Sequence, residues 1–354
     1  MPNKMNRKLF FLLLFIFLGT VLFLGGTFLI EPESVEVNPK QTVKETPQQE
    51  EKQQVKIILA GDIMLNRGVE YMVEKEGTGD FKFPFLKIAD YLKEADIVFG
   101  NLEGVISDKG TNVGSIYSFR VDPKAVEGLN YAGFNVLSLA NNHAFDYSKE
   151  ALEDCLTRLS NEEINYVGAG FSENEAYSPL IKEINSSTGA STELSRMSSP
   201  LRIGFLAYTN LGPETWRAAG ENSGIAWISE NDFEKIKEDI KSAKEMSDVL
   251  IVSLHAGEEY QKTPSQFQID FSKMAIDAGA DLAVGHHPHV VQPNEKYQNG
   301  WIFYSLGNFV FDQSFSEETM ESQIIEILIE DNKIKEINSE EIKINNFFQP
   351  EILK

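Results

Sequence analysis

All five histidines of the chain closely follow apolar runs. The run FNVLSLANN precedes His143, VLIVSL precedes His255, and DLAVG leads into His286, His287 and His289. Imidazole is the commonest metal-ligating side chain and titrates near neutral pH. Open α/β sheets bind their ligands beyond the carboxyl ends of their strands. Because every histidine falls at such a predicted strand end, the sequence predicts an enzyme-like site built around metal.

Carboxylates and amides stand at two other predicted strand ends. Asp62 follows VKIILAG, where Gly61 allows a sharp exit, and a carboxylate in this place suits a hard cation. The alternative for such an Asp is the cap of a helix. Asn101 and Glu103 follow IVFG and, being two residues apart, face the same side of extended backbone. Taken alone, these two residues are more typical of a turn.

The segment LANNHAFD combines two amides, an imidazole and an acid at one strand end. Asn142 offers an oxygen to a metal, and His143 can act as a general acid or base or bind an anionic oxygen. Asp146 can orient His143 or cap the helix that follows, and we expect the helix cap.

The segment GHHPH places three imidazoles within four residues. Pro288 favours extended geometry at the residue before it, His287. His287 and His289 then project to one side of the chain, while His286 points away. With His255 from a different strand, we expect this pair to form half of a metal site. Substitution of His286 is expected to be comparatively mild.

Short apolar runs alternate with amphipathic stretches along the chain, which implies parallel strands with helices outside the sheet. The predicted strands are Val55–Ala60, Ala95–Phe99, Asn135–Leu139, Asn165–Val167, Arg202–Tyr208, Val249–Leu254, Asp281–Val284 and Trp301–Leu306. The predicted helices, with apolar residues at three- and four-residue steps, are Phe85–Glu94, Lys149–Leu159, Phe233–Met246 and Ser265–Ala278. We also expect a closing antiparallel hairpin from Ile324–Ile329 and Ile334–Ile344, and an exposed loop at Glu183–Pro200.

The first 54 residues differ in composition from the remainder. Residues 9–30 carry no charge, and as a helix they would span about 33 Å, enough for the hydrocarbon core of a membrane. Basic residues precede this run and acids follow it, so we expect a single-pass anchor at 1–30 with its N-terminus in the cytoplasm. A cleaved signal peptide is the alternative. Residues 31–54 are rich in Pro, Glu, Gln and Lys and predict a disordered tether. Residues 55–354 are then one extracellular α/β domain at the cell membrane.

Charge and cysteine content exclude some classes of protein. The net charge is −22, from 54 acids against 32 bases, whereas nucleic-acid-binding proteins need a basic surface. We therefore expect no nucleic-acid partner. Cys155 is the only cysteine, so no intramolecular disulfide can form, and its place on the apolar stripe of a helical pattern predicts a buried thiol.

Seven motifs occur in an order that resembles the CapA family of poly-γ-glutamate capsule biosynthesis. They are GDIMLNRGV, FGNLEGVIS, SLANNHAFDYSKEAL, YVGAGFSENEA, HAGEEY, GADLAVGHHPHVVQ and FYSLGNFVFD. The resemblance covers roughly Val55 to Asp312. This family is similar to the calcineurin-like metallophosphatases, and the likeness implies a four-layer αββα sandwich with two metals between the strand tips.

The resemblance also implies roles for single residues. His143 is the candidate acid or base, with Asp146 beside it. The metallophosphatase pattern has a His two residues after its first Asp and a bridging Asp on the next strand. Here Met64 and the pair Asn101 and Glu103 stand in those places. We expect one or two divalent ions, drawn from Mn, Fe, Zn and Mg. The implied metal ligands are Asp62, Glu103, Asn142, His255, His287 and His289.

Three functions follow from these observations. The first is an enzyme-like metalloprotein, anchored in the membrane beside the polymerase and export subunits of a capsule machinery. The second is a non-catalytic subunit that binds or guides anionic polyglutamate. The third is a metal-dependent phosphoesterase or other hydrolase that acts on cell-envelope substrates. The candidate contacts to an anionic substrate are Arg120, Asn101 and Asn308, and the alternative for Arg120 is a surface ion pair.

Overall fold

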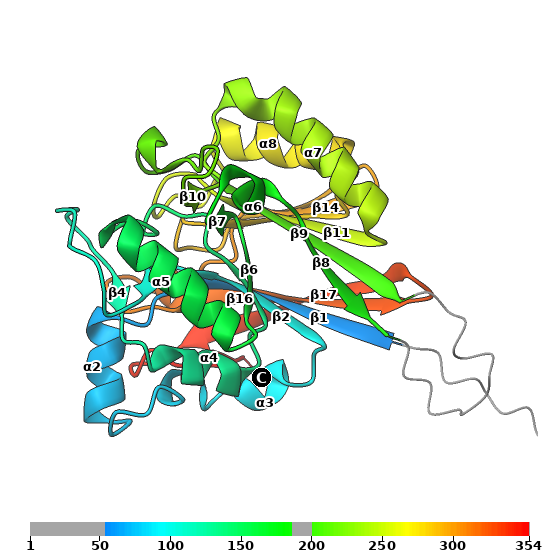
Figure 1. Ribbon diagram of the computed structural model, residues 1–354. Helices are drawn as coiled ribbons and strands as arrows, with labels where there is room; N and C mark the ends of the chain where they lie inside the picture. The colour runs from blue at the N-terminus through cyan, green and yellow to red at the C-terminus, as the bar shows by residue number, and fades with distance from the viewer. Residues whose placement is uncertain (1–53, 186–199, 354) are drawn as a thin grey trace, which may run out of the picture. The chain divides into compact units, whose positions relative to one another are not determined.

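Two β-sheets stand at the centre of the described part of the chain (Figure 1). The structure is a computed structural model, and it describes residues 54–185 and 200–353. This part belongs to one compact unit, Glu51–Lys354. The predicted anchor at 1–30 lies outside the described residues, and so does the predicted tether apart from Gln54. Among the helices of the described part, none has the length and apolar character needed to cross a membrane.

The larger sheet joins the first half of the chain to its C-terminal end. Its strand order is β18-β17-β16-β1-β2-β5-β6, with β15 also paired to β1. Strands β1, β2, β5 and β6 pair in parallel, as predicted, whereas β16, β17 and β18 are antiparallel, so the closing hairpin is confirmed. The strands are β1 Gln54–Ile63, β2 Ile97–Leu102, β5 Val136–Ser138, β6 Asn165–Val167, β15 Asn308–Val310, β16 Glu321–Glu330, β17 Lys333–Ile344 and β18 Pro350–Ile352.

The second sheet comes from the second half of the chain, in the order β13-β14-β12-β11-β9-β8. Its four central strands are parallel, and the edge strands β8 and β13 are antiparallel to their neighbours. The strands are β8 Leu180–Ile184, β9 Leu201–Thr209, β11 Val249–His255, β12 Leu282–His286, β13 Asn294–Tyr297 and β14 Gly300–Phe303. Two small two-stranded sheets pair β3 Val105–Ile106 with β4 Arg120–Val121, and β7 Ala169–Gly170 with β10 Gly224–Ile225.

The sheets pack face to face through one apolar core and carry helices on their outer faces. Between them, Phe99 of β2 stacks on Phe205 of β9 with ring centroids 5.6 Å apart. A second core lies between the larger sheet and its helices, and a third lies under α7 and α8, which cover the other sheet (Figure 1). The α-helices are α2 Arg67–Lys75, α3 Ala89–Leu92, α4 Ala125–Ala132, α5 Ser148–Asn161, α6 Glu173–Tyr177, α7 Phe233–Met246 and α8 Gln266–Asp277. The 3₁₀-helices are η1 Phe83–Phe85, η3 Glu214–Trp216, η4 Glu230–Asp232 and η5 Glu318–Met320. The predicted mixed α/β class is therefore confirmed.

Several predicted elements differ from the structure; the strand predicted at Trp301–Leu306, for example, ends at Phe303. The helix predicted at Phe85–Glu94 is only the end of η1 followed by the four residues of α3. Its apolar residues are buried on a three- and four-residue spacing, but the chain must turn within a few residues to enter β2. The loop predicted at Glu183–Pro200 begins later than expected, because β8 continues to Ile184, and residues 186–199 lie outside the described part. Cys155 is a buried free thiol, as predicted.

Candidate metal centre

The candidate site lies where the carboxyl ends of both sheets meet. In the larger sheet, Asp62 at the end of β1 is in register with Asn101 of β2 and Asn308 of β15. In the second sheet, His255 ends β11 in register with His286, which ends β12. Contacts join the two sheets here: Asn101 Nδ2 lies 3.2 Å from His255 Nδ1, and His286 Nδ1 lies 3.4 Å from Asp62 Oδ1. Residues as far apart in the sequence as Asp62 and His286 therefore share one site.

Three fully buried side chains form the first group of donors. Ligand atoms of Asp62, Glu103 and His255 all lie within 4.8 Å of one another. Glu103 Oε1 is 3.9 Å from His255 Nε2. Neither carboxyl oxygen of Glu103 has a hydrogen-bond partner in the structure, although the residue is completely buried. A buried carboxyl group without partners is costly, and a bound cation would satisfy it.

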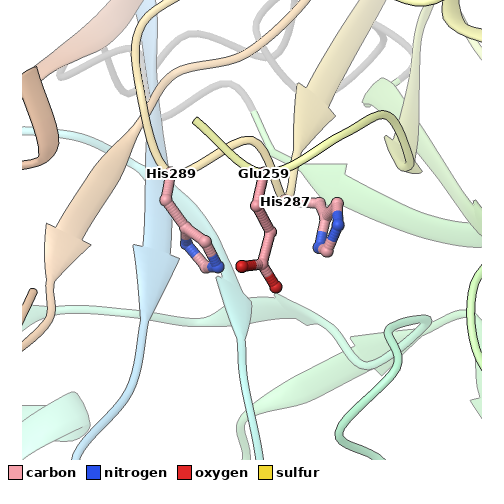
Figure 2. Close-up of side chains that lie close together, drawn as sticks. All are labelled: Glu259, His287 and His289. Atoms are coloured by element: carbon pink, nitrogen blue, oxygen red, sulfur yellow. The ribbon is translucent and has the colours of Figure 1, made fainter. Parts of the chain in front are cut away.

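A second group of donors stands beside the first. Ligand atoms of Glu259, His287 and His289 lie within 4.8 Å of one another, and Figure 2 shows their side chains projecting into the same space. His287 Nδ1 is buried and has no hydrogen-bond partner, whereas Glu259 is exposed. Glu259 is not among the ligands predicted from the sequence. The signal that could have found it is its place in HAGEEY, four residues after the strand-end His255.

The turn GHHPH has a different geometry from the one predicted. His287 and His289 have φ angles of 98° and 58°, so both are in the left-handed region rather than extended. The backbone N–H of Tyr260 donates to Pro288 O at 2.8 Å and holds this turn. Alternation of side chains applies only to extended backbone. His286 consequently does not point away from the site: it is fully buried against Asp62, and both of its ring nitrogens lack hydrogen-bond partners.

Three asparagines hold the donors in place. Asn101 Nδ2 donates to Asp62 Oδ1 at 2.8 Å, and Asn308 Oδ1 lies 3.0 Å from His289 Nδ1. Asn101 and Asn308 are fully buried and each contacts a donor, and a contact of either with a substrate stays a prediction. Asn142 Oδ1 lies 2.8 Å from His255 Nε2, beside the first group.

His143 lies at the edge of the first group together with Asp146. Its Nδ1 is 2.7 Å from Asp146 Oδ2, and its Nε2 is 3.9 Å from Glu103 Oε2. Asp146 does not cap α5, because that helix begins after Tyr147 without a side-chain cap; its Oδ2 accepts instead from the backbone N–H of Phe119. The expected helix cap is therefore wrong, and Asp146 contacts His143 as the alternative required.

Burial shifts the pKa values of these groups toward their neutral forms. It raises the pKa of Glu103 well above 4.5, and the negative charges of Asp62, Glu259 and Asp146 raise it further. Burial and the neighbouring imidazoles lower the pKa of His255 well below 6.5, and burial with His289 lowers that of His287 to about 3. Both imidazoles are therefore neutral at pH 7, which is the form that binds metal.

The pKa of Asp62 shifts in the opposite direction from that of Glu103. Burial alone would raise its pKa, but the His286 imidazole, whose Nδ1 lies 3.4 Å from Asp62 Oδ1, and then the His289 imidazole lower it below 3.8. Three imidazoles and three carboxyl groups, one of them buried without hydrogen bonds, together form a donor set that fits a divalent cation.

A cleft of about 190 Å³ opens beside the donors and gives access to them. His143, Glu259 and His289 line it, together with the aromatic rings of the loops above. Arg120 is not among its lining residues: the guanidinium lies over the ring of Tyr147 at 4.4 Å and donates to Lys109 O at 3.2 Å. Neither sequence-based expectation for Arg120, a contact in the cleft or a surface ion pair, agrees with this placement.

Comparison with known proteins identifies the family. The model of the family described as bacterial capsule synthesis protein PGA_cap matches residues 56–313. The chain belongs to this family. All of the donors above lie within the matched region of this capsule synthesis family, and the resemblance predicted from the motifs is confirmed.

Two curated relatives and one solved structure illustrate the similarity. The chain is 33% identical over 290 residues to the capsule biosynthesis protein CapA of Bacillus anthracis, covering 80% of this chain and 66% of the relative. It is 30% identical over 275 residues to the PGA biosynthesis protein CapA of Bacillus subtilis strain 168, which covers 77% of this chain and 67% of that relative. The chain thus spans about two thirds of the length of these relatives. A phosphatase from Mycoplasma pneumoniae aligns with a TM-score of 0.45 and 17% identity, over 82% of this chain and 94% of that one.

Proposed function

We propose that this chain binds one or two divalent metal ions between its two sheets and serves the synthesis or export of a poly-γ-glutamate capsule. The observation that carries the proposal is the convergence of two three-donor groups on one space, with the oxygens of Glu103 buried and without partners. Membership of the capsule synthesis family supports the biological role. The layers of helices around two face-to-face sheets support a metallophosphatase-like αββα sandwich.

The contacts of the donor residues indicate which of them would bind each metal ion. Asp62, Glu103 and His255 would hold one ion, and Glu259, His287 and His289 a second. Bound metal would polarise a phosphoryl, carboxyl or amide oxygen of the substrate, or activate water, at neutral pH. Asn142 would complete the first group. The three asparagine contacts and the buried turn that carries His287 would keep these donors at their separation.

His143 would move a proton at the edge of the cleft. His143 Nδ1 faces Asp146 Oδ2 at 2.7 Å, so a hydrogen bond from Nδ1 to this oxygen would leave Nε2 of the neutral imidazole able to accept a proton. Nε2 is on the side of Glu103, 3.9 Å from that carboxyl group, and His143 also lines the cleft. This is the arrangement of a general acid or base whose orientation a carboxylate maintains.

The proposed setting is the outer face of the cytoplasmic membrane. The uncharged run at 9–30 would anchor the chain with its N-terminus in the cytoplasm, and residues 31–54 would tether an extracellular domain. Membrane-embedded subunits that polymerise and export the capsule polymer would be its partners. A reporter fused after Lys354 should be active outside the cytoplasm, and activity confined to the cytoplasm would contradict this topology.

Metal content and capsule restoration test the function together. Full-length protein should contain a divalent metal by elemental analysis. His287→Ala should lose metal, because it removes a donor, whereas His143→Ala should retain metal and fail to restore capsule in a deletion strain. If neither the wild type nor any variant holds metal after exposure to Mn²⁺ or Zn²⁺, the metal centre is wrong. If His143→Ala restores capsule fully, the chain binds polymer without catalysis.

A second candidate function is hydrolysis of a phosphoester of the cell envelope. The observation that favours it is the pair of His143 and Asp146 beside two adjacent donor groups. Phosphoester hydrolysis by metalloenzymes uses bound metal together with a nearby general acid or base. Turnover of a generic phosphoester by metal-loaded wild type, lost in His143→Ala, would support this function. Capsule that persists in the deletion strain would favour it over the capsule role.

A further inference from the structure

Besides its two histidines, the cleft is lined by one basic side chain, that of Arg67. Among its lining residues, all of which the structure describes, Arg67 is the only Lys or Arg. The acidic side chains there are Glu259 and Asp312, and the whole chain carries a net charge of −22. An anionic ligand that approaches this cleft is repelled by most of the protein surface. Arg67 is therefore the one side chain of the cleft that attracts such a ligand before it reaches the donors.

Arg67 is held in place by an unusual local structure. It begins α2 with a φ of 51°, a left-handed conformation that is uncommon for a residue with a long side chain. Its Nε donates to Asp312 Oδ2 at 3.1 Å and its Nη2 donates to Asp312 Oδ1. The backbone N–H of Gly68 donates to the same Asp312 Oδ2 at 2.9 Å. Strained backbone of this kind persists only where surrounding contacts enforce it, and it clusters at binding sites.

The guanidinium keeps binding capacity after this pairing. Among the described residues, Nη1 of Arg67 has no hydrogen-bond partner, and the side chain is 33% exposed, toward the cleft it lines. The guanidinium lies 5.0 Å from the ring of Phe119, and the imidazole of His143 lies 4.1 Å from the same ring. The ring of Phe119 thus contacts both Arg67 and His143, the proposed acid or base. Ordinary surface ion pairs contribute little to stability, so pairing with Asp312 alone does not account for this arrangement.

We infer that Arg67 is the residue that binds an oxyanion of the substrate, a carboxylate or a phosphoryl group, and that Asp312 positions it. This inference rests on the proposed function, because it takes the substrate to react beside His143. The planar guanidinium would offer its free N–H groups to two oxygens of one anion. Exposed rings of Tyr117 and Phe315 at the mouth of the cleft would contact the carbon skeleton next to that anion.

Binding of two defined probes tests the inference. Full-length protein loaded with Mn²⁺ is titrated calorimetrically with γ-linked pentaglutamate and, separately, with inorganic phosphate. A hydrogen bond to a charged group contributes about 1.5–3 kcal/mol, so Arg67→Gln should raise the Kd of the true ligand class roughly 10- to 100-fold. Arg67→Lys keeps the charge but loses the planar fork, and its Kd should fall between those of wild type and Arg67→Gln.

Arg120→Gln is the matched control, because it removes the same charge from a guanidinium outside the cleft. It should bind both probes with the Kd of the wild type. Weakening of pentaglutamate binding alone by Arg67→Gln assigns a carboxylate ligand, and weakening of phosphate binding alone assigns a phosphoryl ligand. Unchanged Kd values for both probes in Arg67→Gln overturn the inference, and so does a folded, metal-loaded wild type that binds neither probe.

Metal content separates this inference from the proposed function. Arg67→Gln and Arg67→Lys should hold as much Mn²⁺ as the wild type, because Arg67 contacts none of the six donors among the described residues. If the wild type holds no metal, the proposed function fails, while the dependence of probe binding on Arg67 still decides the inference. If Arg67→Gln does not fold by near-UV circular dichroism, Arg67→Lys decides, and a wild-type Kd for both probes in that variant refutes the role of the fork.

Discussion

Replacement of Glu103 by Gln tests the metal centre most directly. The substitution keeps the volume of the side chain and removes its charge, so it does not open a cavity between the sheets. Glu103 is fully buried, its oxygens have no hydrogen-bond partners, and three acidic groups raise its pKa further. A divalent cation would therefore gain more from this carboxylate than from a donor already hydrogen-bonded to protein, and we expect Glu103→Gln to weaken metal binding about 100-fold or more.

The expected size of the effect follows from linkage. At a metal concentration 100 times the Kd, the wild type gains about 2.7 kcal/mol of unfolding free energy. For a domain of about 300 residues that corresponds to a rise in Tm of roughly 4 °C. With a Kd 100-fold larger, the same concentration contributes only about 0.4 kcal/mol, or a rise in Tm of about 1 °C.

The assay is differential scanning calorimetry of full-length protein with and without Mn²⁺, together with elemental analysis. Glu326→Gln is the matched control: Glu326 accepts from Tyr91 OH at 2.9 Å and pairs with Lys56 at 2.7 Å, away from the donors. It should lower the Tm of the metal-free protein while preserving the rise caused by metal. A full metal-induced rise in Glu103→Gln, with wild-type metal content, would refute the assignment of Glu103 as a ligand.

Three further results are expected. In the metal-free protein, the raised pKa of Glu103 contributes stability that is complete below its unfolded value near 4.5 and is lost as pH rises through the folded pKa. The free energy of unfolding of the wild type relative to Glu103→Gln should therefore fall from pH 4.5 upward in denaturant titrations, and parallel pH curves would contradict this. Phe205→Ala removes a fully buried ring stacked on Phe99 between the sheets and should cost about 3–5 kcal/mol in the same titrations, so a loss under 1 kcal/mol would be inconsistent with the inter-sheet core. His286→Ala removes the side chain 3.4 Å from Asp62 and should weaken metal binding roughly 10- to 100-fold, so unchanged affinity would count against its orienting role.

Most strands and the main helices could be predicted because local sequence encodes them. The helix α7 begins and ends where the apolar spacing indicated, and β6 matches the predicted strand. Buried parallel strands are continuous apolar runs, and surface helices repeat their apolar residues every three or four positions. The same logic places Asp62 and His255 at strand ends as candidate donors, whereas Glu103, which taken alone is more typical of a turn, is a candidate only through the family resemblance.

What the sequence by itself determined is the alternation of strands and helices, the family and the strand ends at which polar groups gather. Only the tertiary structure decided which of these groups meet. The left-handed φ of His287 depends on a turn held by Tyr260 from another loop, so simple alternation failed there and His286 came to lie against Asp62. Arg67, rather than Arg120, lines the cleft because Asp312, 245 residues away, fixes its side chain. Periodicity reports the local backbone and the face that is buried, whereas distances between side chains at a site depend on contacts between distant segments, which no local pattern records.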